Sequence, residues 1–296
     1  MYGSDWKQRQ RASAKCDTRN PNATSNSCTE LVGTMAKVPL DPHDGHSILN
    51  AYVKMRMSLT PVEVVVWFTG SVYAYSDGDS HHLFEVEGYN IGRSVRTSNG
   101  FDLLSREVML YCHPHNNVTV HEFQNPFTGR LNQVLHRWND PLNVQLRSDD
   151  ASSMPQVLVA GAHVHMCTDV VENSPNPLPP RRWPVESGGD EYRHTEFSRL
   201  IATVADVDDD GDSAPTQVSI IRFGPWLPWM GMGDTPGHLI YRVGGCQLDG
   251  YQSLSSQLRT EVEDGHPEFM FAPASLRTPN ETEWTMYSKL RRPMLR

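Results

Sequence analysis

Short runs in which apolar and polar residues alternate fill most of the chain, and residues typical of turns separate them. The alternation has a period of two, and the runs are rich in β-branched and aromatic residues, which predicts antiparallel β-strands. The runs lie at 52–59, 62–75, 82–95, 101–112, 118–124, 130–138, 156–170, 192–204, 216–224 and 238–245. Because closure removes the exposed edges of a sheet, about ten strands without a strong helical pattern predict an all-β fold, a closed antiparallel β-barrel of the lipocalin or calycin type.

One short helix is expected near the C-terminus. Residues 253–264 place Leu254, Leu258 and Val262 on one helical face, and the serines at the start of the segment are suitable N-caps. The proline-rich stretch 173–184 predicts a long surface loop, with a position that would suit a lid.

We expect one domain over residues 1–296, in which a loop segment at 1–45 precedes a barrel at 46–290. The loop segment is rich in Asn, Ser and Thr and has almost no apolar residue to hold it in place. A disulfide between Cys16 and Cys28 would constrain it, because a cross-link lowers the entropy of the unfolded segment. The chain has 5 cysteines, so at least one thiol is unpaired or pairs between chains, which leaves a homodimer open.

Composition and charge exclude several classes of partner. The formal net charge is -9 at pH 7 and no basic face offsets it, which argues against nucleic acid and anionic membranes. No apolar run reaches the length of about 18 residues that a membrane span needs. Acceptor patterns for N-glycans begin at Asn22, Asn117 and Asn280. With the cysteine-containing loop they indicate the secretory pathway, although the first residues do not form a signal peptide.

Three patterns resemble ligand sites without completing one. Residues 205–212 match the first half of a calcium-binding EF-hand loop, but the position that should be a bidentate Glu is Gln217, so a charged hairpin tip explains them better. The glycines of 230–237 lack the spacing and the strand-to-helix context of a dinucleotide-binding loop. His163 and His165 share one side of a predicted strand, but the sequence supplies no third ligand, and we predict no metal site.

Several blocks of the sequence resemble a family of barrel proteins that is known only as a domain of unknown function. The blocks are NPFTGRLNQVLHRWNDPLN (125–143), YRHTEFSRL (192–200), GPWLPWMGMGDTPG (224–237) and NETEW (280–284), together with VVVWFTGSVYAY and SREVMLY. The resemblance extends over most of the chain. The run of tryptophans, prolines and methionines in the third block is an unusual string, which makes the resemblance specific.

A narrower resemblance is to fungal enzymes of tropolonic sesquiterpene biosynthesis, which are secreted, glycosylated and disulfide-bearing barrel proteins. This resemblance implies a hetero-Diels–Alderase that joins a tropolone o-quinone methide to the hydrocarbon humulene and forms a dihydropyran ring. The partners would be two small molecules, a tropolone-type polyketide and a sesquiterpene hydrocarbon, and no cofactor would be needed. The resemblance supplies no catalytic residues, so candidates must come from what the chemistry requires.

The cycloaddition would need a wide apolar pocket with a few hydrogen-bond donors at one end. A hydrocarbon is held only by shape and dispersion, and its burial contributes roughly 25 cal/mol per Å² of apolar surface. A donor to the tropolone oxygen would stabilise charge that develops in the transition state. Trp226, Trp229, Met230 and Met232 offer flat or adaptable apolar walls for such a pocket. They suit an end cap that closes the core equally well.

The polar end of the pocket would come from strand residues that an apolar core does not accommodate. These residues are Arg56, Trp67, Tyr73, Glu107, His163, His165, Tyr192, His194, Glu196, Arg222 and Arg242. Each faces either solvent or a cavity, because unpaired burial of a polar group is costly. His163 and His165 are the leading candidates to face inward and act as acids or donors, since the small residues of their run leave room.

The remaining roles follow from side-chain chemistry. Arg222 or Arg242 would bind the tropolone oxygens, which resemble a bidentate anion, and His194 is a further candidate acid. The aromatic substrate-binding residues would include Trp67, Tyr73 and Tyr192. Two other functions stay open at this point. One is a lipocalin-like carrier of an apolar small molecule, and the other is a dehydratase or isomerase that uses a His/Glu pair.

Overall fold

The structure is a computed structural model that describes residues 40–150, 154–276 and 281–291. By its internal contacts the chain divides into two units, Met1–Ala36 and Lys37–Arg296, and all the described residues belong to the second unit. The predicted single domain therefore stays a prediction where the first unit is concerned.

Part of the predicted secretory signature lies outside the described residues. Cys16, Cys28, Asn22 and Asn280 are all in this group. Asn117 is described, and it is exposed in the turn after the third strand with φ 59, a conformation that asparagine tolerates better than most residues. A glycan at Asn117 would therefore extend into solvent.

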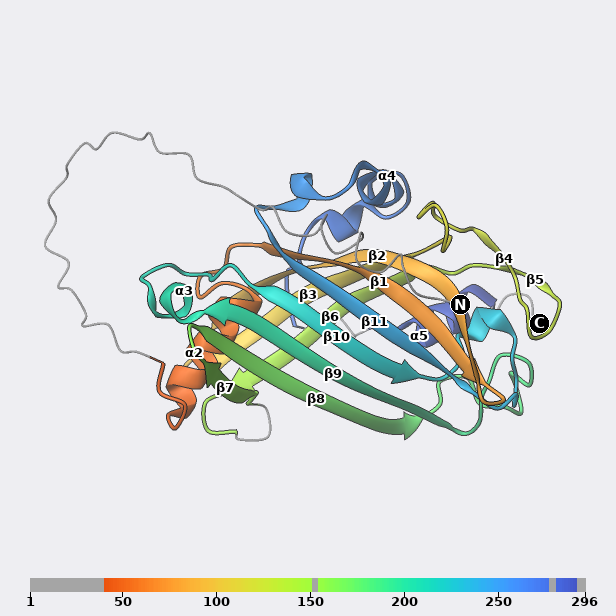
Figure 1. Cartoon of the computed structure of the whole chain (residues 1–296), viewed down its shortest axis with the longest axis horizontal. Helices are drawn as coiled ribbons and strands as arrows, with labels where there is room; N and C mark the ends of the chain where they lie inside the picture. Colours follow the sequence, from red (N-terminus) through yellow and green to blue (C-terminus); the bar gives the residue numbers. More distant parts are fainter. Residues whose placement is uncertain (1–39, 151–153, 277–280, 292–296) are drawn as a thin grey trace, which may run out of the picture. The chain divides into compact units, whose positions relative to one another are not determined.

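One antiparallel sheet dominates the structure. It has nine strands in the order β6-β3-β2-β1-β11-β10-β9-β8-β7 (Figure 1). The strands are β1 (Val64–Ser76), β2 (Asp79–Arg96), β3 (Gly100–Cys112), β6 (Arg137–Arg147), β7 (Gln156–Ala160), β8 (His163–Pro175), β9 (Glu191–Thr203), β10 (Gln217–Gly224) and β11 (His238–Leu248). Two further strands, β4 (Glu122–Gln124) and β5 (Leu131–Gln133), form a separate hairpin. The mainly β, antiparallel character of the fold is confirmed, whereas the described residues contain more helices than the one that the sequence predicts.

Helices pack on both faces of the sheet. They are α2 (Gly45–Arg56), α3 (Val204–Asp208), α4 (Ser256–Gly265) and α5 (Glu283–Arg291), with 3-10 turns η2 (Pro228–Met230), η3 (Tyr251–Ser253) and η4 (Pro267–Met270). Figure 1 shows α2 at one end of the sheet and α4 beside β1 and β2. Among the described residues, no helix has the length and apolar character to cross a membrane.

The sheet curls around α2, which brings its two ends toward a common apolar cluster. Leu103 of β3 and Leu146 of β6 belong to the same cluster as Met166 of β8 and Leu200 of β9, with helix residues such as Met55 among them. Within the described part of the chain, the end strands β6 and β7 pair only with β3 and β8. Closure into a barrel is therefore not confirmed by strand pairing.

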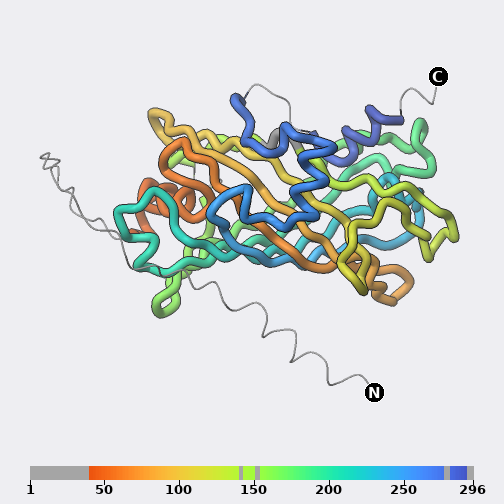
Figure 2. Tube along the Cα trace, turned by 90° about the horizontal axis from the view of Figure 1, so that it is seen from above, coloured from red at the N-terminus to blue at the C-terminus, as the bar shows by residue number. Residues whose placement is uncertain are grey.

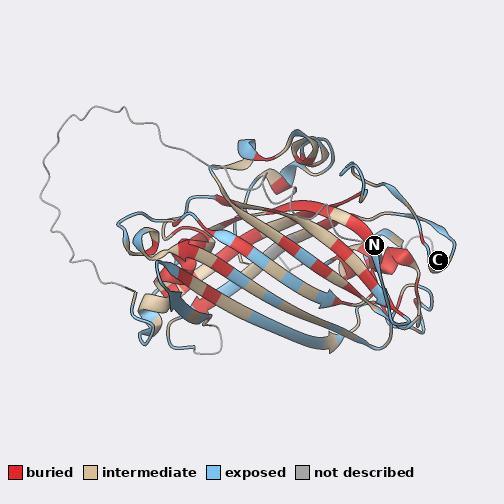
Figure 3. Ribbon diagram, viewed as in Figure 1, coloured by how far each residue is buried: buried red, intermediate tan, exposed pale blue. Residues whose placement is uncertain are grey.

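Alternating residues divide the sheet into an inner and an outer face. We call the face that packs against α2 and η2 the inner face; Phe68 and Val72 of β1 lie there. Val65, three residues before Phe68 and so in the opposite phase of the alternation, belongs to an outer cluster with Leu258 and Val262 of α4. Figure 2 shows the blue segment that contains α4 running over the orange and yellow strands. Burial follows this cover, since β3 is mostly buried whereas β8 is mostly exposed or intermediate (Figure 3).

The helix expected near the C-terminus is confirmed. The hydroxyl of Ser255 caps α4 by accepting a hydrogen bond from the backbone N–H of Leu258, and Leu254, Leu258 and Val262 are buried. The region predicted as strand 52–59 is instead largely part of α2. Asp44 caps this helix, and the second half of the helix, which overlaps the predicted strand, is buried on nearly all sides. A helix that is buried on all sides shows no single apolar stripe. Its short apolar run therefore fits a strand pattern as well as a helix pattern.

Three other predictions need correction. The predicted strand 130–138 contains β5 and only the first residues of β6. The predicted strand 156–170 is the hairpin β7–β8, and Gly161 makes its turn with φ 59. The proline-rich stretch 173–184 is not simply a surface loop, because Leu178 and Trp183 are buried in the inner-face core. Large apolar side chains between prolines fix this connection against the sheet.

The Gly244–Gly245 pair at the β1–β11 ladder provides a test of the fold. A Cβ on Gly245 would overlap the carbonyl oxygen of Trp67 and approach the Cα of Phe68 to 2.7 Å, whereas one on Gly244 would meet only the carbonyl of Val218 at 3.6 Å. We expect Gly245→Ala to lower the free energy of unfolding by about 1–3 kcal/mol. Gly244→Ala should leave it within about 0.5 kcal/mol. Urea unfolding of both variants measures the difference, and equal stability would contradict the register.

Candidate functional site

A band of polar side chains crosses the inner face between two apolar clusters. On β3, Phe101 and Leu103 belong to the cluster around α2, Met109 and Tyr111 belong to the cluster around η2, and Glu107 lies between them. We define the polar band as Glu107, Tyr111, Arg137, Tyr192, His194, Arg222, Tyr241 and Glu283. Its members come from five strands and from α5, so only the folded sheet brings them together.

An ion pair between Arg137 and Glu283 forms one half of the band. Arg137 Nε lies 2.9 Å from Glu283 Oε2, and the two side chains are only 6% and 2% exposed. Arg137 Nη1 also lies 3.2 Å from Glu107 Oε1, and the Tyr111 hydroxyl donates to Glu283 Oε1 at 2.8 Å. Burial and then Glu283 raise the pKa of Tyr241 to about 12 and raise that of Tyr111 well above its usual value. Both phenols therefore stay protonated at neutral pH.

Arg222 forms the other half of the band. It lies opposite Glu196 on β9 and opposite Tyr241 on β11, and its Nη2 donates to the Tyr192 hydroxyl at 2.8 Å. His194 lies two residues from Tyr192, with its Nδ1 3.3 Å from Glu172 Oε2. Burial and then the Arg222 charge lower the pKa of His194, while Glu172 acts in the opposite direction. The imidazole is therefore neutral at physiological pH.

A cavity of about 460 Å³ lies next to the band. It is lined by α2, β3, β6, β7, β8 and β9 and by Met154. Leu103, Val144, Leu146 and Val170 supply an apolar wall, and the polar lining includes Arg56, Glu196, Thr168 and Tyr52. This volume is within the range of about 300–1,000 Å³ that is typical of small-molecule sites.

Arg56 connects the cavity to the band electrostatically. Tyr52 raises the pKa of Arg56 most, burial opposes this, and the carboxylates of Glu196 and Glu107 add to the increase. Glu107 belongs to the band and Glu196 lines the cavity, so the two carboxylates share one cation. The arrangement can hold an oxygen-bearing group beside an apolar body.

Comparison with known proteins identifies a family. Residues 62–291 match the family described as "Protein of unknown function (DUF1838)". The chain belongs to the DUF1838 family. No curated protein matches the chain. The DUF1838 region contains every residue of the polar band, from Glu107 to Glu283, whereas α2 with Tyr52 and Arg56 precedes it.

The structure corrects the two leading candidates for this DUF1838 chain. His163 is exposed and His165 is half-buried, while Val164 and Met166 between and beside them are 0% and 1% exposed in the inner cluster. The expectation that the two histidines face inward is therefore wrong. Successive strand residues face opposite sides, and the sequence supports either phase because valine and methionine alternate with histidine.

Three other candidates also lie on the outer face. Arg242 is exposed because its neighbour Tyr241 is the inward residue. Trp67 Nε1 donates to the carboxylate of Glu87 at 3.0 Å. The hydroxyl of Ser255, the residue that caps α4, donates to the same carboxylate. Tyr73 stacks on His82, with ring centroids 4.8 Å apart. Of the predicted residues, the inner face thus brings together Tyr192, His194 and Arg222, with Arg56, Glu107 and Glu196.

The tryptophan-rich segment forms an end cap of the inner face. Trp226, Trp229, Met230 and Met232 are all buried in one cluster, and Trp226 Nε1 donates to the backbone carbonyl of Thr235 at 2.9 Å. Trp229 packs edge-on against Tyr111, with centroids 5.6 Å apart. The structure supports the end-cap interpretation for these residues over that of a wide pocket wall.

The site residues predicted from the sequence did not include Tyr111, Arg137, Tyr241 or Glu283. Arg137 and Glu283 lie inside two of the blocks that carry the family resemblance, HRWND and NETEW. A charged residue directly next to a tryptophan is the signal that could have identified them, because a charge beside a large apolar side chain is rarely buried without a partner.

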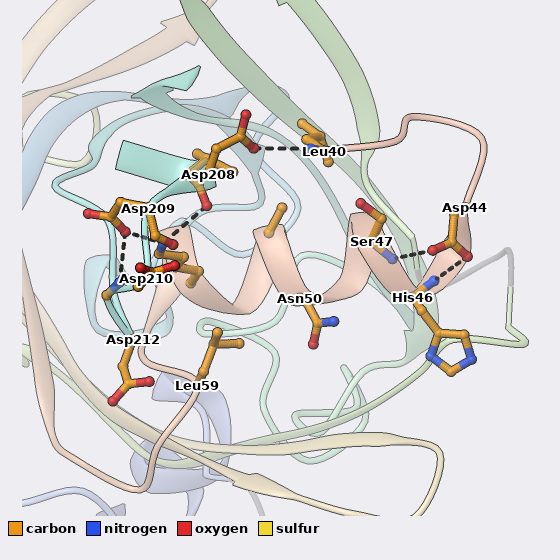
Figure 4. Close-up of a pocket in the computed structure, with 14 residues that line it drawn as sticks. Leu40, Asp44, His46, Ser47, Asn50, Leu59, Asp208, Asp209, Asp210 and Asp212 are labelled. Atoms are coloured by element: carbon orange, nitrogen blue, oxygen red, sulfur yellow. Dashed lines mark hydrogen bonds and ion pairs between the residues drawn. The ribbon is translucent and has the colours of Figure 1, made fainter. Parts of the chain in front are cut away.

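A second hollow, of about 390 Å³, lies beside α2 and contains the EF-hand-like stretch (Figure 4). Its carboxylates already serve structural hydrogen bonds. Asp208 accepts from the backbone N–H of Leu40 at 3.0 Å, Asp209 pairs with the ammonium of Lys54, and Asp212 accepts from Thr60 at 3.1 Å. The stretch connects the paired strands β9 and β10, as expected for a hairpin connection. In the described ranges, no group of three acidic, His or Cys residues could hold a metal ion.

A buried histidine beside the site makes stability depend on pH. His136 Nδ1 accepts from the backbone N–H of Tyr111 at 3.1 Å, and burial, followed by His121, lowers the pKa of His136 to about 4. In the unfolded chain the imidazole of His136 binds a proton at about pH 6.5. The contribution of the neutral imidazole to the free energy of unfolding is therefore fully present above that pH and is lost as the pH falls toward 4.

We expect the free energy of unfolding to fall by about 2 kcal/mol more in the wild type than in His136→Asn between pH 7 and pH 5. Asn retains an acceptor near the Tyr111 N–H but does not titrate. His163→Asn, a change on the exposed outer face and away from His136, is the control and should behave as the wild type. Urea unfolding at both pH values gives the comparison; equal losses in all three proteins would show that His136 does not titrate as described.

Proposed function

We propose that the chain is an enzyme that binds a small organic substrate in the inner-face cavity and acts on its oxygen atoms through fixed hydrogen-bond donors. The observation that carries this proposal is the cavity of about 460 Å³, whose lining combines aliphatic side chains with Arg56, Glu196 and Tyr52. Pockets of this kind hold an apolar body by burial and orient it with a few polar groups.

We further propose that the reaction is an intermolecular hetero-Diels–Alder cycloaddition between a tropolone o-quinone methide and a humulene-type sesquiterpene. The alkene of the hydrocarbon adds across the O=C–C=C unit, one C–C and one C–O bond form, and no atom leaves. The reaction needs no cofactor, only two oriented reactants and a donor to the oxygen. The curled sheet would act as a barrel whose wall is completed by the side chains between β6 and β8.

The roles differ from those expected first. Leu103, Leu146 and Val170 would contact the hydrocarbon, in place of Trp226 and Trp229, which close the core. The oxygen of the quinone methide would lie toward Arg222, which faces the cavity residue Glu196 across the β9–β10 ladder. The outer-face residues His163, His165 and Arg242 have no part in this proposal.

The second candidate function is a carrier that binds an apolar small molecule and catalyses no reaction. One observation favours this function over an enzyme that uses acid–base catalysis. Burial lowers the pKa of His194 and raises the pKa values of Tyr192 and Tyr241, in each case away from neutrality. These groups suit fixed hydrogen bonds better than proton transfer at pH 7. The His/Glu dehydratase or isomerase is therefore the weakest of the three functions.

The reaction itself is tested with humulene and a quinone-methide precursor. We expect purified protein to give a single product enantiomer faster than the uncatalysed background, measured by chiral chromatography. Heat-unfolded protein is the control and should give the background mixture. Saturable binding of humulene without any effect on rate or stereochemistry would support the carrier instead.

The position of the site is tested by filling the cavity. Val170 lines it, whereas the next residue, Val171, lies on the other face and is 77% exposed. We expect Val170→Trp to lower kcat/KM by roughly tenfold or more, because displaced reactants lose their alignment. Val171→Trp adds the same side chain outside the cavity and should retain full activity. Equal activities of the two variants would place the site elsewhere.

A further inference from the structure

The two band arginines have different partners. Arg137 contacts two carboxylates, Glu283 and Glu107. Within the described part of the chain, Arg222 donates only to a neutral group, the Tyr192 hydroxyl at 2.8 Å. Its Nε is buried and has no hydrogen-bond partner among the described residues. A charged, planar group of five donors is therefore incompletely used at the centre of the inner face.

An unused donor of this kind calls for an acceptor. Leaving a buried donor unsatisfied is costly, and the cost is greater when the group is charged. The Nε edge of a guanidinium matches the two oxygens of a planar anion, so a bidentate ligand would satisfy it where a single water would satisfy only one N–H. The nearest carboxylate in the strand register, Glu196, makes no hydrogen bond to Arg222 in the described structure and faces Arg56 as well.

The neighbours of Arg222 complete a recognition surface. The Tyr192 hydroxyl uses its lone pair to accept from Arg222, so its own hydrogen is available to a ligand. His194 and Trp284 both contact the ring of Tyr192. The ring centroids of His194 and Tyr192 are 5.4 Å apart, and those of Trp284 and Tyr192 are 4.8 Å apart. These two ring contacts hold the Tyr192 ring, and with it the hydroxyl that accepts from Arg222.

We propose that Arg222, Tyr192 and His194 form a binding subsite for the planar, conjugated oxyanion of a small organic acid. The subsite rests on the proposed function in that it would hold the oxygen-bearing reactant of the same site. It adds that this reactant binds as an anion, with its negative charge shared between two oxygens. Arg222 supplies the charge, Tyr192 supplies a second donor, and His194 supplies a neutral ring edge.

The probe is 4-fluorobenzoate, a planar conjugated carboxylate, observed by ¹⁹F NMR titration of the full chain. Its neutral isostere, 4-fluorobenzamide, tests the need for charge. We expect saturable binding of the benzoate, and binding at least about tenfold weaker for the benzamide, because the bidentate ionic hydrogen bonds are lost. Equal affinity for the two probes, or no saturable binding of the benzoate, would overturn the subsite.

Two arginine variants locate the binding. Arg222→Gln should weaken benzoate binding by at least about tenfold. Arg242→Gln removes the same charge one position along the paired strand, on the exposed outer face, and should leave the affinity unchanged. If Arg222→Gln fails to fold, Tyr192→Phe retains the cation and removes one donor, and should weaken binding about threefold to tenfold. Wild-type affinity in these inner-face variants would overturn the assignment.

The outcomes separate the subsite from the reaction. Arg222-dependent benzoate binding without any cycloadduct would sink the reaction and leave the subsite in place. A cycloaddition rate that is unchanged in Arg222→Gln would sink the subsite and leave the reaction in place. Both measurements use the same protein preparations, so a folding defect would be visible in each.

Discussion

The buried ion pair between Arg137 and Glu283 is the contact on which the inner face depends. It joins an end strand of the sheet, β6, to the C-terminal helix α5, at a position where both side chains are almost fully excluded from solvent. Two charges are stable there only because Tyr111 and Glu107 supply further hydrogen bonds. Removal of one partner from such a pair costs about 3–5 kcal/mol, whereas an apolar pair of similar size often costs nothing. The ion pair is thus better explained by what it positions than by stability.

The two apolar clusters give the polar band its environment. The end cap around Trp229 and the helix α2 close the inner face on either side, so the band lies in a medium of lower dielectric than water. Hydrogen bonds are stronger in such a medium, and an unpaired donor is more costly. The cavity lined by β3, β6, β8 and β9 lies next to the band, at the side where the cluster around α2 begins. A ligand there would contact both the aliphatic side chains of the lining and the charged groups of Arg56 and Glu196.

Local pattern was enough to predict the strands but not the faces. Period-two alternation located β1, β2, β3, β9, β10 and β11 closely, because strand propensity and turn residues act within a few positions of one another. A shift of one residue reverses every side chain, and nothing near His163 decides between it and Val164. The helix α2 was missed for a related reason, since burial on nearly all sides removes the stripe that marks an amphipathic helix. Glu283 reaches the site through tertiary packing alone.

The register of the sheet resolves what the sequence left undecided. Arg222 and Arg242 had equal claims as strand arginines flanked by apolar residues. In the β10–β11 ladder, Arg222 lies directly opposite Tyr241, and directly opposed residues project to the same face. Tyr241 is buried against Tyr111, so Arg222 must face inward and Arg242, the next residue on β11, must face outward. The burial of Tyr241 and its pairing with Arg222 therefore determine which of the two arginines can meet a ligand. Glu196 is directly opposite Arg222 in the β9–β10 ladder, so its side chain projects to the same inner face.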